Sequence, residues 1–159
     1  MKLSVAFLIS CAAALAKANF DLYLGQESGT TPVGDVHETW NIYPNDPSCS
    51  DVENSRNWFG RDDVSKQTGI RCKGGCFGGS AVTDIEELEM HFTNDPLYHF
   101  TIYRDRNYDM YGTDGQVYGN CIPFPGNSYS CHRGQVIYDG VRKFRCLTHL
   151  TVPQIESGN

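Results

Sequence analysis

The chain has 159 residues, about one domain's worth, and a formal net charge of −6. An acidic balance argues against broad binding to nucleic acid or to anionic membranes, because both need a surface rich in Lys and Arg. The best candidates for a local basic patch are Arg142, Lys143 and Arg145. Their spacing in an alternating stretch favours a solvated strand face over a binding patch.

The first 18 residues have the pattern of a secretory signal peptide. Met1-Lys2 is positive, residues 3–15 form an apolar run too short to span a bilayer comfortably, and Ala16-Lys17-Ala18 fits a cleavage site. We therefore expect residues 19–159 to be one secreted, extracellular domain, with 11 Lys and Arg against 19 Asp and Glu, a net charge of −8. Since no second apolar run of spanning length follows, no membrane insertion is expected.

Alternation of apolar and polar residues predicts two strands early in this domain. These are residues 20–24 (FDLYL) and 37–43 (HETWNIY), joined by a polar, glycine-containing connection at 25–34. Residues 50–53 (SDVE) have the form of a capping box, so a short helix is predicted to run to about Phe59.

The stretch from Ile85 to Tyr103 is predicted to be a β-hairpin that turns at Asn94-Asp95-Pro96. Its period of two selects one register, because a slip of one residue would turn charged side chains toward the core. On the apolar face, this register pairs Phe92 with Tyr98, Met90 with Phe100 and Leu88 with Ile102. On the polar face, it pairs His91 with His99, Glu89 with Thr101 and Glu87 with Tyr103.

That polar face is the richest candidate for catalysis. A carboxylate beside a histidine can perform general acid–base chemistry, which makes Glu89, His91 and His99 the catalytic candidates if the protein is an enzyme. The alternative is the ordinary solvated face of a half-exposed antiparallel sheet. A zinc site on the same three residues has no supporting spacing, so neither a metal nor a cofactor is expected.

The last third of the chain predicts two more hairpins. Asp114-Gly115 favours a turn that would set Tyr111 opposite Tyr118, and Asp139-Gly140 favours a turn within residues 135–148, with residues 122–130 as a loop between the two hairpins. The predicted fold class is therefore all-β or β-rich α+β, an antiparallel sheet of hairpins with at most one short helix.

Cysteine usage agrees with export. An even number remains beyond the signal peptide, which predicts three disulfides with 15 possible pairings: Cys49, Cys72, Cys76, Cys121, Cys131 and Cys146. We favour Cys72–Cys76, Cys121–Cys131 and Cys49–Cys146, because the first two close short loops containing Gly or Pro.

Signal peptide, small acidic domain, six cysteines and many tyrosines together resemble the small secreted cysteine-rich proteins of filamentous fungi, many of which are candidate effectors in virulence. Residues 111–119 (YGTDGQVYG) and 126–131 (GNSYSC) are in addition similar to the late strands of guanyl-specific ribonucleases and their effector relatives. The catalytic His of that family would fall near Pro123, so the resemblance implies a non-catalytic relative.

The sequence thus predicts a secreted, effector-like binding protein whose partner is a protein or glycan of a host or competitor, and its motifs favour binding over catalysis without deciding between them. A monomer is expected. The binding candidates are Tyr103, Arg104, Arg106, Tyr108 and Tyr111, with core packing as the alternative for each tyrosine. A ribonuclease-like hydrolase using Glu89 and His91 is the second hypothesis, and a protease inhibitor or antimicrobial protein is the third.

Overall fold

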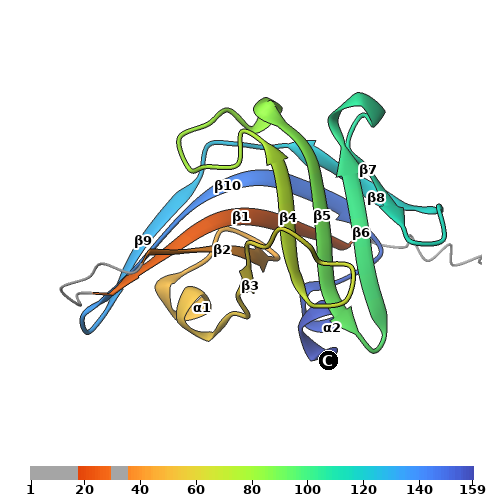
Figure 1. Cartoon of the computed structure of the whole chain (residues 1–159). Helices are drawn as coiled ribbons and strands as arrows, with labels where there is room; N and C mark the ends of the chain where they lie inside the picture. Colours follow the sequence, from red (N-terminus) through yellow and green to blue (C-terminus); the bar gives the residue numbers. More distant parts are fainter. Residues whose placement is uncertain (1–17, 30–35) are drawn as a thin grey trace, which may run out of the picture.

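The computed structural model describes residues 18–29 and 36–159, which form ten strands in one antiparallel sheet (Figure 1). The predicted signal peptide falls almost wholly outside the described residues. Along the sheet the order is β3-β2-β1-β10-β8-β7-β6-β5-β4, and β9 pairs with β10. The strands are β1 (Ala18–Gly29), β2 (Val36–Tyr43), β3 (Trp58–Phe59), β4 (Gly69–Gly74), β5 (Ile85–Asn94), β6 (Leu97–Tyr103), β7 (Asp109–Gly112), β8 (Val117–Pro123), β9 (Ser128–Arg133) and β10 (Val136–Thr148).

The two ends of this sheet meet, so the sheet is a nearly closed barrel. Gly60, directly after β3, forms a parallel bridge with Ile70 of β4, and the backbone N–H of Arg61 donates to the Ile70 carbonyl (2.9 Å). Closure removes the unpaired edges that an open sheet would expose. The predicted β-rich antiparallel fold is confirmed. The limit of one short helix is wrong, since the described residues include α1 (Cys49–Asn54) and α2 (Val152–Ser157).

Two long strands carry the sheet beyond the barrel. Strands β1 and β10 pair along their whole lengths. The second half of β10 pairs with β8 inside the barrel, whereas its first half pairs with β9 outside it. We call the resulting extension the wing: it comprises β9, residues 136–141, residues 24–29 and residues 36–38, and it lies on the left in Figure 1.

A pair of glycines explains why β10 is one strand and not the predicted hairpin. Gly140 pairs with Gly25 of β1, and both lie under the side chain of Tyr129. A Cβ on Gly140 would come within 2.3 Å of the Tyr129 ring. Glycine here allows the close approach of an aromatic ring and does not mark a turn. For the same reason, β1 continues through Gly25 where the sequence predicts a connection.

Inward-facing side chains fill the barrel. Among the largest that are fully buried are Phe20, Trp40, Trp58, Phe92 and Phe144. A second, smaller cluster lies between α1 and the sheet and is built mainly from tyrosines, namely Tyr23 and Tyr43 with Tyr129 and Tyr138 packed against them. The barrel is therefore a packed core and not an open channel.

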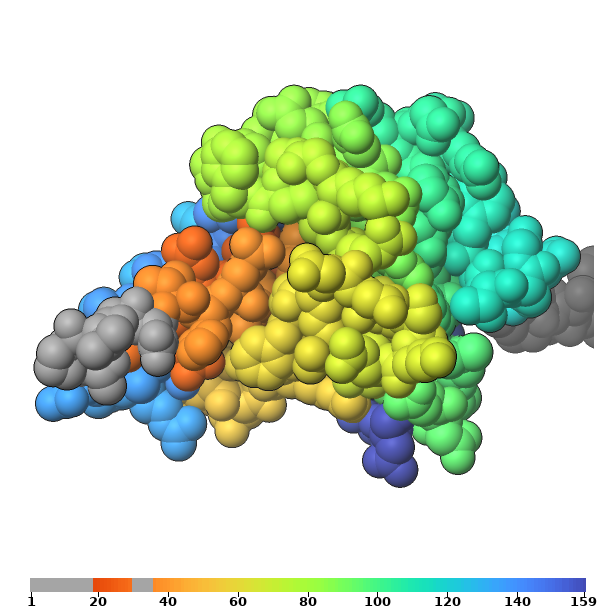
Figure 2. All heavy atoms as spheres, viewed as in Figure 1, coloured from red at the N-terminus to blue at the C-terminus, as the bar shows by residue number. Residues whose placement is uncertain are grey.

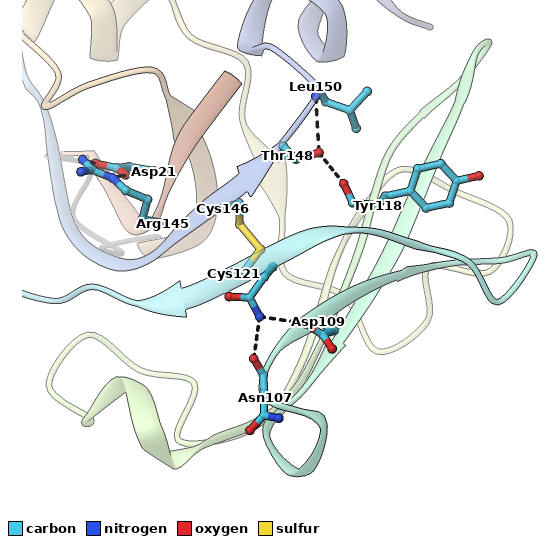
Figure 3. Close-up of a disulfide and its surroundings, with 10 residues drawn as sticks. Asp21, Asn107, Asp109, Tyr118, Cys121, Arg145, Cys146, Thr148 and Leu150 are labelled. Atoms are coloured by element: carbon cyan, nitrogen blue, oxygen red, sulfur yellow. Dashed lines mark hydrogen bonds and ion pairs between the residues drawn. A yellow bond between two sulfur atoms is a disulfide. The ribbon is translucent and has the colours of Figure 1, made fainter. Parts of the chain in front are cut away.

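The six cysteines of the described residues form the disulfides Cys49–Cys131, Cys72–Cys76 and Cys121–Cys146. The predicted Cys72–Cys76 bond is confirmed, and the other two predicted pairings are wrong. Cys121 and Cys146 face one another across β8 and β10 (Figure 3), so the adjacency of these two strands decides the pairing. Three disulfides are typical of a protein from an oxidising compartment.

The capping box of helix α1 lies two residues before the predicted one. Its N-cap is Ser48, whose hydroxyl accepts from the backbone N–H of Asp51, while the Asp51 carboxylate accepts from the backbone N–H of Ser48 (2.8 Å). The helix ends at Asn54 and not near Phe59, which lies in β3 and is exposed. The short helix is thus confirmed, but its predicted cap and end are wrong.

The central hairpin, β5 and β6, has the predicted register everywhere except beside its turn. All three predicted polar-face pairs are present, as are Met90 with Phe100 and Leu88 with Ile102. A bulge then pairs Tyr98 with Thr93 instead of Phe92, and the turn shortens to two residues. The bulge keeps Phe92 in the core, where its ring meets the edge of Trp58 at 5.1 Å.

The hairpin of β7 and β8 also departs from its prediction. Tyr111 pairs with Val117 after a bulge, and not with Tyr118. The carboxylate of Asp114 accepts from the backbone N–H of Gln116 (3.0 Å) and from the Tyr118 hydroxyl (2.8 Å), which stabilises a longer turn than two residues. The predicted loop at 122–130 is shorter, because β8 and β9 extend into it from both sides.

Candidate functional site

The outer face of β4, β5 and β6 brings together the charged and imidazole side chains of the central hairpin. Strand β4 places Arg71 opposite Glu89 and Lys73 opposite Glu87. We call this group the hairpin network; its members are Arg71, Lys73, Glu87, Glu89, His91 and His99. The predicted register of the hairpin is confirmed, while the catalytic role of Glu89, His91 and His99 stays a prediction.

Glu89 lies at the centre of the hairpin network, and both of its carboxylate oxygens accept hydrogen bonds. Oε1 faces Nε2 of His99 at 2.9 Å, and Oε2 accepts from Nε of Arg71 at 2.7 Å. Burial acts to raise the pKa of Glu89, but the hydrogen bonds and charges of Arg71 and His99 outweigh it and lower that pKa. A carboxylate with a lowered pKa and two occupied oxygens is a weak general base.

His91 is buried and uses both ring nitrogens. Nδ1 lies 2.7 Å from the Val64 carbonyl oxygen, and Nε2 lies 3.1 Å from Oδ1 of Asn94. Its ring stacks on that of His99, with the centroids 4.5 Å apart. His91 thus fastens the 61–68 loop to the sheet and has no nitrogen left for a substrate. In residues 18–29 and 36–159, no three His, Cys, Asp or Glu side chains are placed to hold a metal ion.

Three of the predicted binding residues meet on the surface beside this network. The guanidinium of Arg106 lies over the ring of Tyr103 (4.7 Å to the centroid) and that of Tyr111 (5.5 Å). Both tyrosines are partly exposed and Arg106 is exposed. The register puts Tyr103 opposite Glu87, so this group continues the outer face of the hairpin. We call Tyr103, Arg106 and Tyr111 the tyrosine–arginine surface.

The other two predicted binding residues lie elsewhere. Tyr108 is 6% exposed, and its hydroxyl donates to the Ile85 carbonyl at 3.2 Å, so core packing is its role. Arg104 is exposed but engaged, because its guanidinium donates to the Thr83 carbonyl (3.0 Å) and pairs with Glu86 (3.4 Å).

The predicted solvated face of Arg142, Lys143 and Arg145 is wrong for its first two residues, which are buried. Arg142 donates to the carboxylate of Asp21 (3.0 Å). Lys143 donates to three backbone carbonyls in the 77–80 loop at 2.9–3.2 Å, which tie that loop to β10. Local charge alone did not show that these cations are held inside the molecule by oxygens distant in sequence.

Sequence reasoning missed a hollow at the mouth of the barrel, lined in part by Glu38. Its neighbour Trp40 is fully buried on the same side of β2. The alternation in residues 37–43 contains the signal that Glu38 and Trp40 share a face. The opposite wall, from β4 and its disulfide, follows only from the closure of the barrel.

Searches with family models, among curated proteins and among solved structures each found no match to this chain. Among the described residues, no helix has both the length and the apolar character needed to cross a membrane.

Proposed function

We propose that this chain is a secreted, effector-like binding protein that acts on a host or competitor molecule through the tyrosine–arginine surface. One observation carries the proposal. Arg106 is held over two tyrosine rings, yet within residues 18–29 and 36–159 its guanidinium makes no hydrogen bond or ion pair. An exposed arginine with a fixed position and free donors is suited to a partner.

The position of Arg106 lowers the entropy cost of binding a partner and leaves its N–H donors available. A free arginine side chain loses rotamer freedom on binding, and stacking on Tyr103 and Tyr111 has already removed part of that freedom. The planar guanidinium offers five N–H donors in a fixed geometry. Tyrosine and arginine are also the residue types that contribute most at protein interfaces.

The partner is a protein or glycan that presents oxygen acceptors to Arg106. The three disulfides support secretion, as does the predicted signal sequence, because such bonds persist in oxidising compartments. The acidic net charge of the chain disfavours a polyanionic partner with extended contacts.

The test compares the secreted protein with Arg106→Ala and Tyr103→Ala, on an array of glycans and on a panel of purified extracellular proteins from candidate hosts. We expect at least one saturable partner of the wild type, and binding weakened about tenfold or more by each substitution. Arg104→Ala is the matched control, since Arg104 is also exposed but lies outside the surface, and it should bind as the wild type does. Equal binding by wild type and Arg106→Ala would refute the assignment.

A ribonuclease-like hydrolase, or an inactive relative of one, is a second candidate because Glu89, Arg71 and His99 meet on one sheet face. A carboxylate, a cation and an imidazole are the groups that a phosphodiester cleavage would use. The hydrolase hypothesis predicts RNA cleavage by the wild type that is lost in Glu89→Gln. Absence of cleavage by folded wild type excludes the active hydrolase and leaves the inactive relative and the binding proposal.

A further inference from the structure

A hollow of about 480 Å³ lies on the surface of the barrel, where β7, β8 and the end of β10 adjoin. It is lined by Asp109, by residues 117–120 and by residues 147–150. Figure 3 shows Asp109, Tyr118 and Leu150 around this part of β8. The volume falls within the range of ligand sites, so the side chains that line the hollow indicate what it binds.

Apolar side chains form much of this lining. Val117 and Tyr118 are 55% and 42% exposed, which places them among the exposed large apolar side chains in the described part of the chain. Leu147 and Leu150, from the end of β10 and just beyond it, are partly exposed. Exposed apolar side chains that lie together leave water when a ligand covers them, so they favour an occupant with an apolar body.

The lining also contains two oxygen acceptors that have no donor. Asp109 is partly buried, and its Oδ1 accepts from the side-chain amide of Asn120 at 3.0 Å. The same amide nitrogen donates to the Asn107 carbonyl at 2.7 Å, and these two acceptors fix which way the Asn120 amide is turned. Within residues 18–29 and 36–159, neither Oδ2 of Asp109 nor Oδ1 of Asn120 accepts a hydrogen bond. Both are therefore available to a ligand that brings donors.

The segments that build the hollow favour a cation by their charge. Residues 107–132 contain two aspartates and no Lys or Arg, and residues 146–159 contain one glutamate and no Lys or Arg. The lining itself includes the imidazole of His149, and Asp109 is its one carboxylate. An uncharged apolar ligand would cover the Asp109 carboxylate without pairing it, which costs free energy. A ligand with an apolar stem and a cationic end satisfies both the walls and the carboxylate.

We propose that this hollow binds a lysine side chain of a partner protein. The methylene stem of the lysine packs against Tyr118, Leu147 and Leu150, and its ammonium donates to Oδ2 of Asp109 and Oδ1 of Asn120. Lysine fits because it joins an apolar four-carbon stem to a compact charge with three donors. Arginine fits less well, since the Asn120 amide already occupies one oxygen of Asp109 and so prevents the bidentate pairing that a guanidinium favours. The hollow shares no residue with the tyrosine–arginine surface and is a separate place for a partner.

The experiment follows the side-chain amide signal of Asn120 in ¹H–¹⁵N spectra of the secreted protein. The probes are capped glycine peptides that carry lysine, arginine or norleucine at their central position. We expect the lysine peptide to move the Asn120 signal in a saturable manner, the arginine peptide to bind several-fold more weakly, and the norleucine peptide to leave the signal in place. No saturable movement with lysine, or equal movement with norleucine, would overturn the proposal. Equal affinity for the arginine peptide would overturn the choice of lysine.

A pair of variants locates the site. Asp109→Asn keeps an oxygen that accepts from Asn120, and it should weaken binding of the lysine peptide about tenfold or more, because the ammonium loses the one carboxylate of the lining. Asp105→Asn is the matched control, since Asp105 is exposed, lies outside the hollow and changes the net charge by the same amount. It should bind as the wild type does. Unchanged affinity in Asp109→Asn, or equal weakening in both variants, would refute a lysine site at Asp109.

Discussion

The hairpin network and the hollow at the barrel mouth share strand β4 but satisfy their polar groups differently. Outside the barrel, Arg71 binds Glu89 and Glu87, and each oxygen of Glu89 has a donor. At the mouth, the N–H of Trp40 makes no close hydrogen bond, and it interacts with the carboxyl of Glu38, whose pKa it acts to lower. The side chains that look most reactive by type are therefore occupied with one another, and the free donors lie at Arg106.

Polar groups that are paired with one another and polar groups that are left unpaired have different roles in the protein. A paired and hydrogen-bonded cluster stabilises the fold and offers little to a ligand, whereas an unpaired donor costs free energy that a ligand can return. Residue type alone therefore favours the hairpin network as the functional site. The hydrogen bonds do not favour it, because its charged groups already have partners. If this distinction holds, substitutions in the hairpin network should affect stability most, and substitution of Arg106 should affect it least.

The largest effect is expected at the centre of the hairpin network. Glu89→Ala removes the carboxylate that pairs with both Arg71 and His99, so His99 loses this partner and Arg71 keeps only Glu87. A fully buried pair would cost more, but these side chains are partly exposed, so we expect a loss of about 2 kcal/mol in the free energy of unfolding. Urea denaturation measures it. Glu86→Ala, whose side chain is 61% exposed, is the control and should change stability by less than about 0.5 kcal/mol.

The sequence predicted this network only in part. Periodicity determined which residues share the hairpin face, because a shift of register would bury charges. It did not reveal Arg71, since the pairing of β4 with β5 crosses ten intervening residues, or the Val64 carbonyl that occupies His91. Both depend on tertiary contacts that no local pattern contains.

The fold was predicted wrongly where a local turn signal conflicted with a tertiary contact. Asp139-Gly140 is a strong turn signal, but Gly140 is needed beneath the Tyr129 ring and the strand continues. Conversely, helix α2 had a readable signal that was overlooked: the hydroxyl of Thr151 accepts from the backbone N–H of Gln154, whose side chain accepts from the Thr151 N–H (2.9 Å). Capping pairs outside long periodic stretches therefore merit a search.

The second prediction compares the two tryptophans under one substitution. Trp58→Phe and Trp40→Phe remove similar volume from the same core, but only Trp58→Phe leaves a carbonyl, that of Phe92, without its donor. We expect Trp58→Phe to lower the free energy of unfolding by about 1–2 kcal/mol more than Trp40→Phe does. Equal losses, measured by denaturation without any ligand, would mean that the interaction of the Trp40 N–H with the Glu38 carboxyl stabilises the fold as much as the hydrogen bond of Trp58 does.

The third prediction concerns pH. Because the pKa of Glu89 in the folded protein lies below the ordinary glutamate value of 4.5, the unfolded chain takes up the proton first as pH falls. The contribution of Glu89 is therefore complete above about pH 4.5 and is lost as the pH falls through the folded pKa. Wild type should lose more of its free energy of unfolding than Glu89→Gln does over this interval. Parallel stability curves would show that Glu89 is not held as the structure indicates.

The smallest effect on stability should come from the residue to which we assign recognition. Arg106 contacts Tyr103 and Tyr111 only through the faces of their rings, and an exposed contact of this kind contributes about 0.5 kcal/mol. Arg106→Ala should therefore unfold almost as the wild type does. Arg71→Ala should be markedly less stable, because Glu87 then keeps only Lys73 and Glu89 only His99, with no cation shared between the two carboxylates. A loss at Arg106 as large as that at Arg71 would make both arginines structural and would remove the reason for placing a partner on the tyrosine–arginine surface.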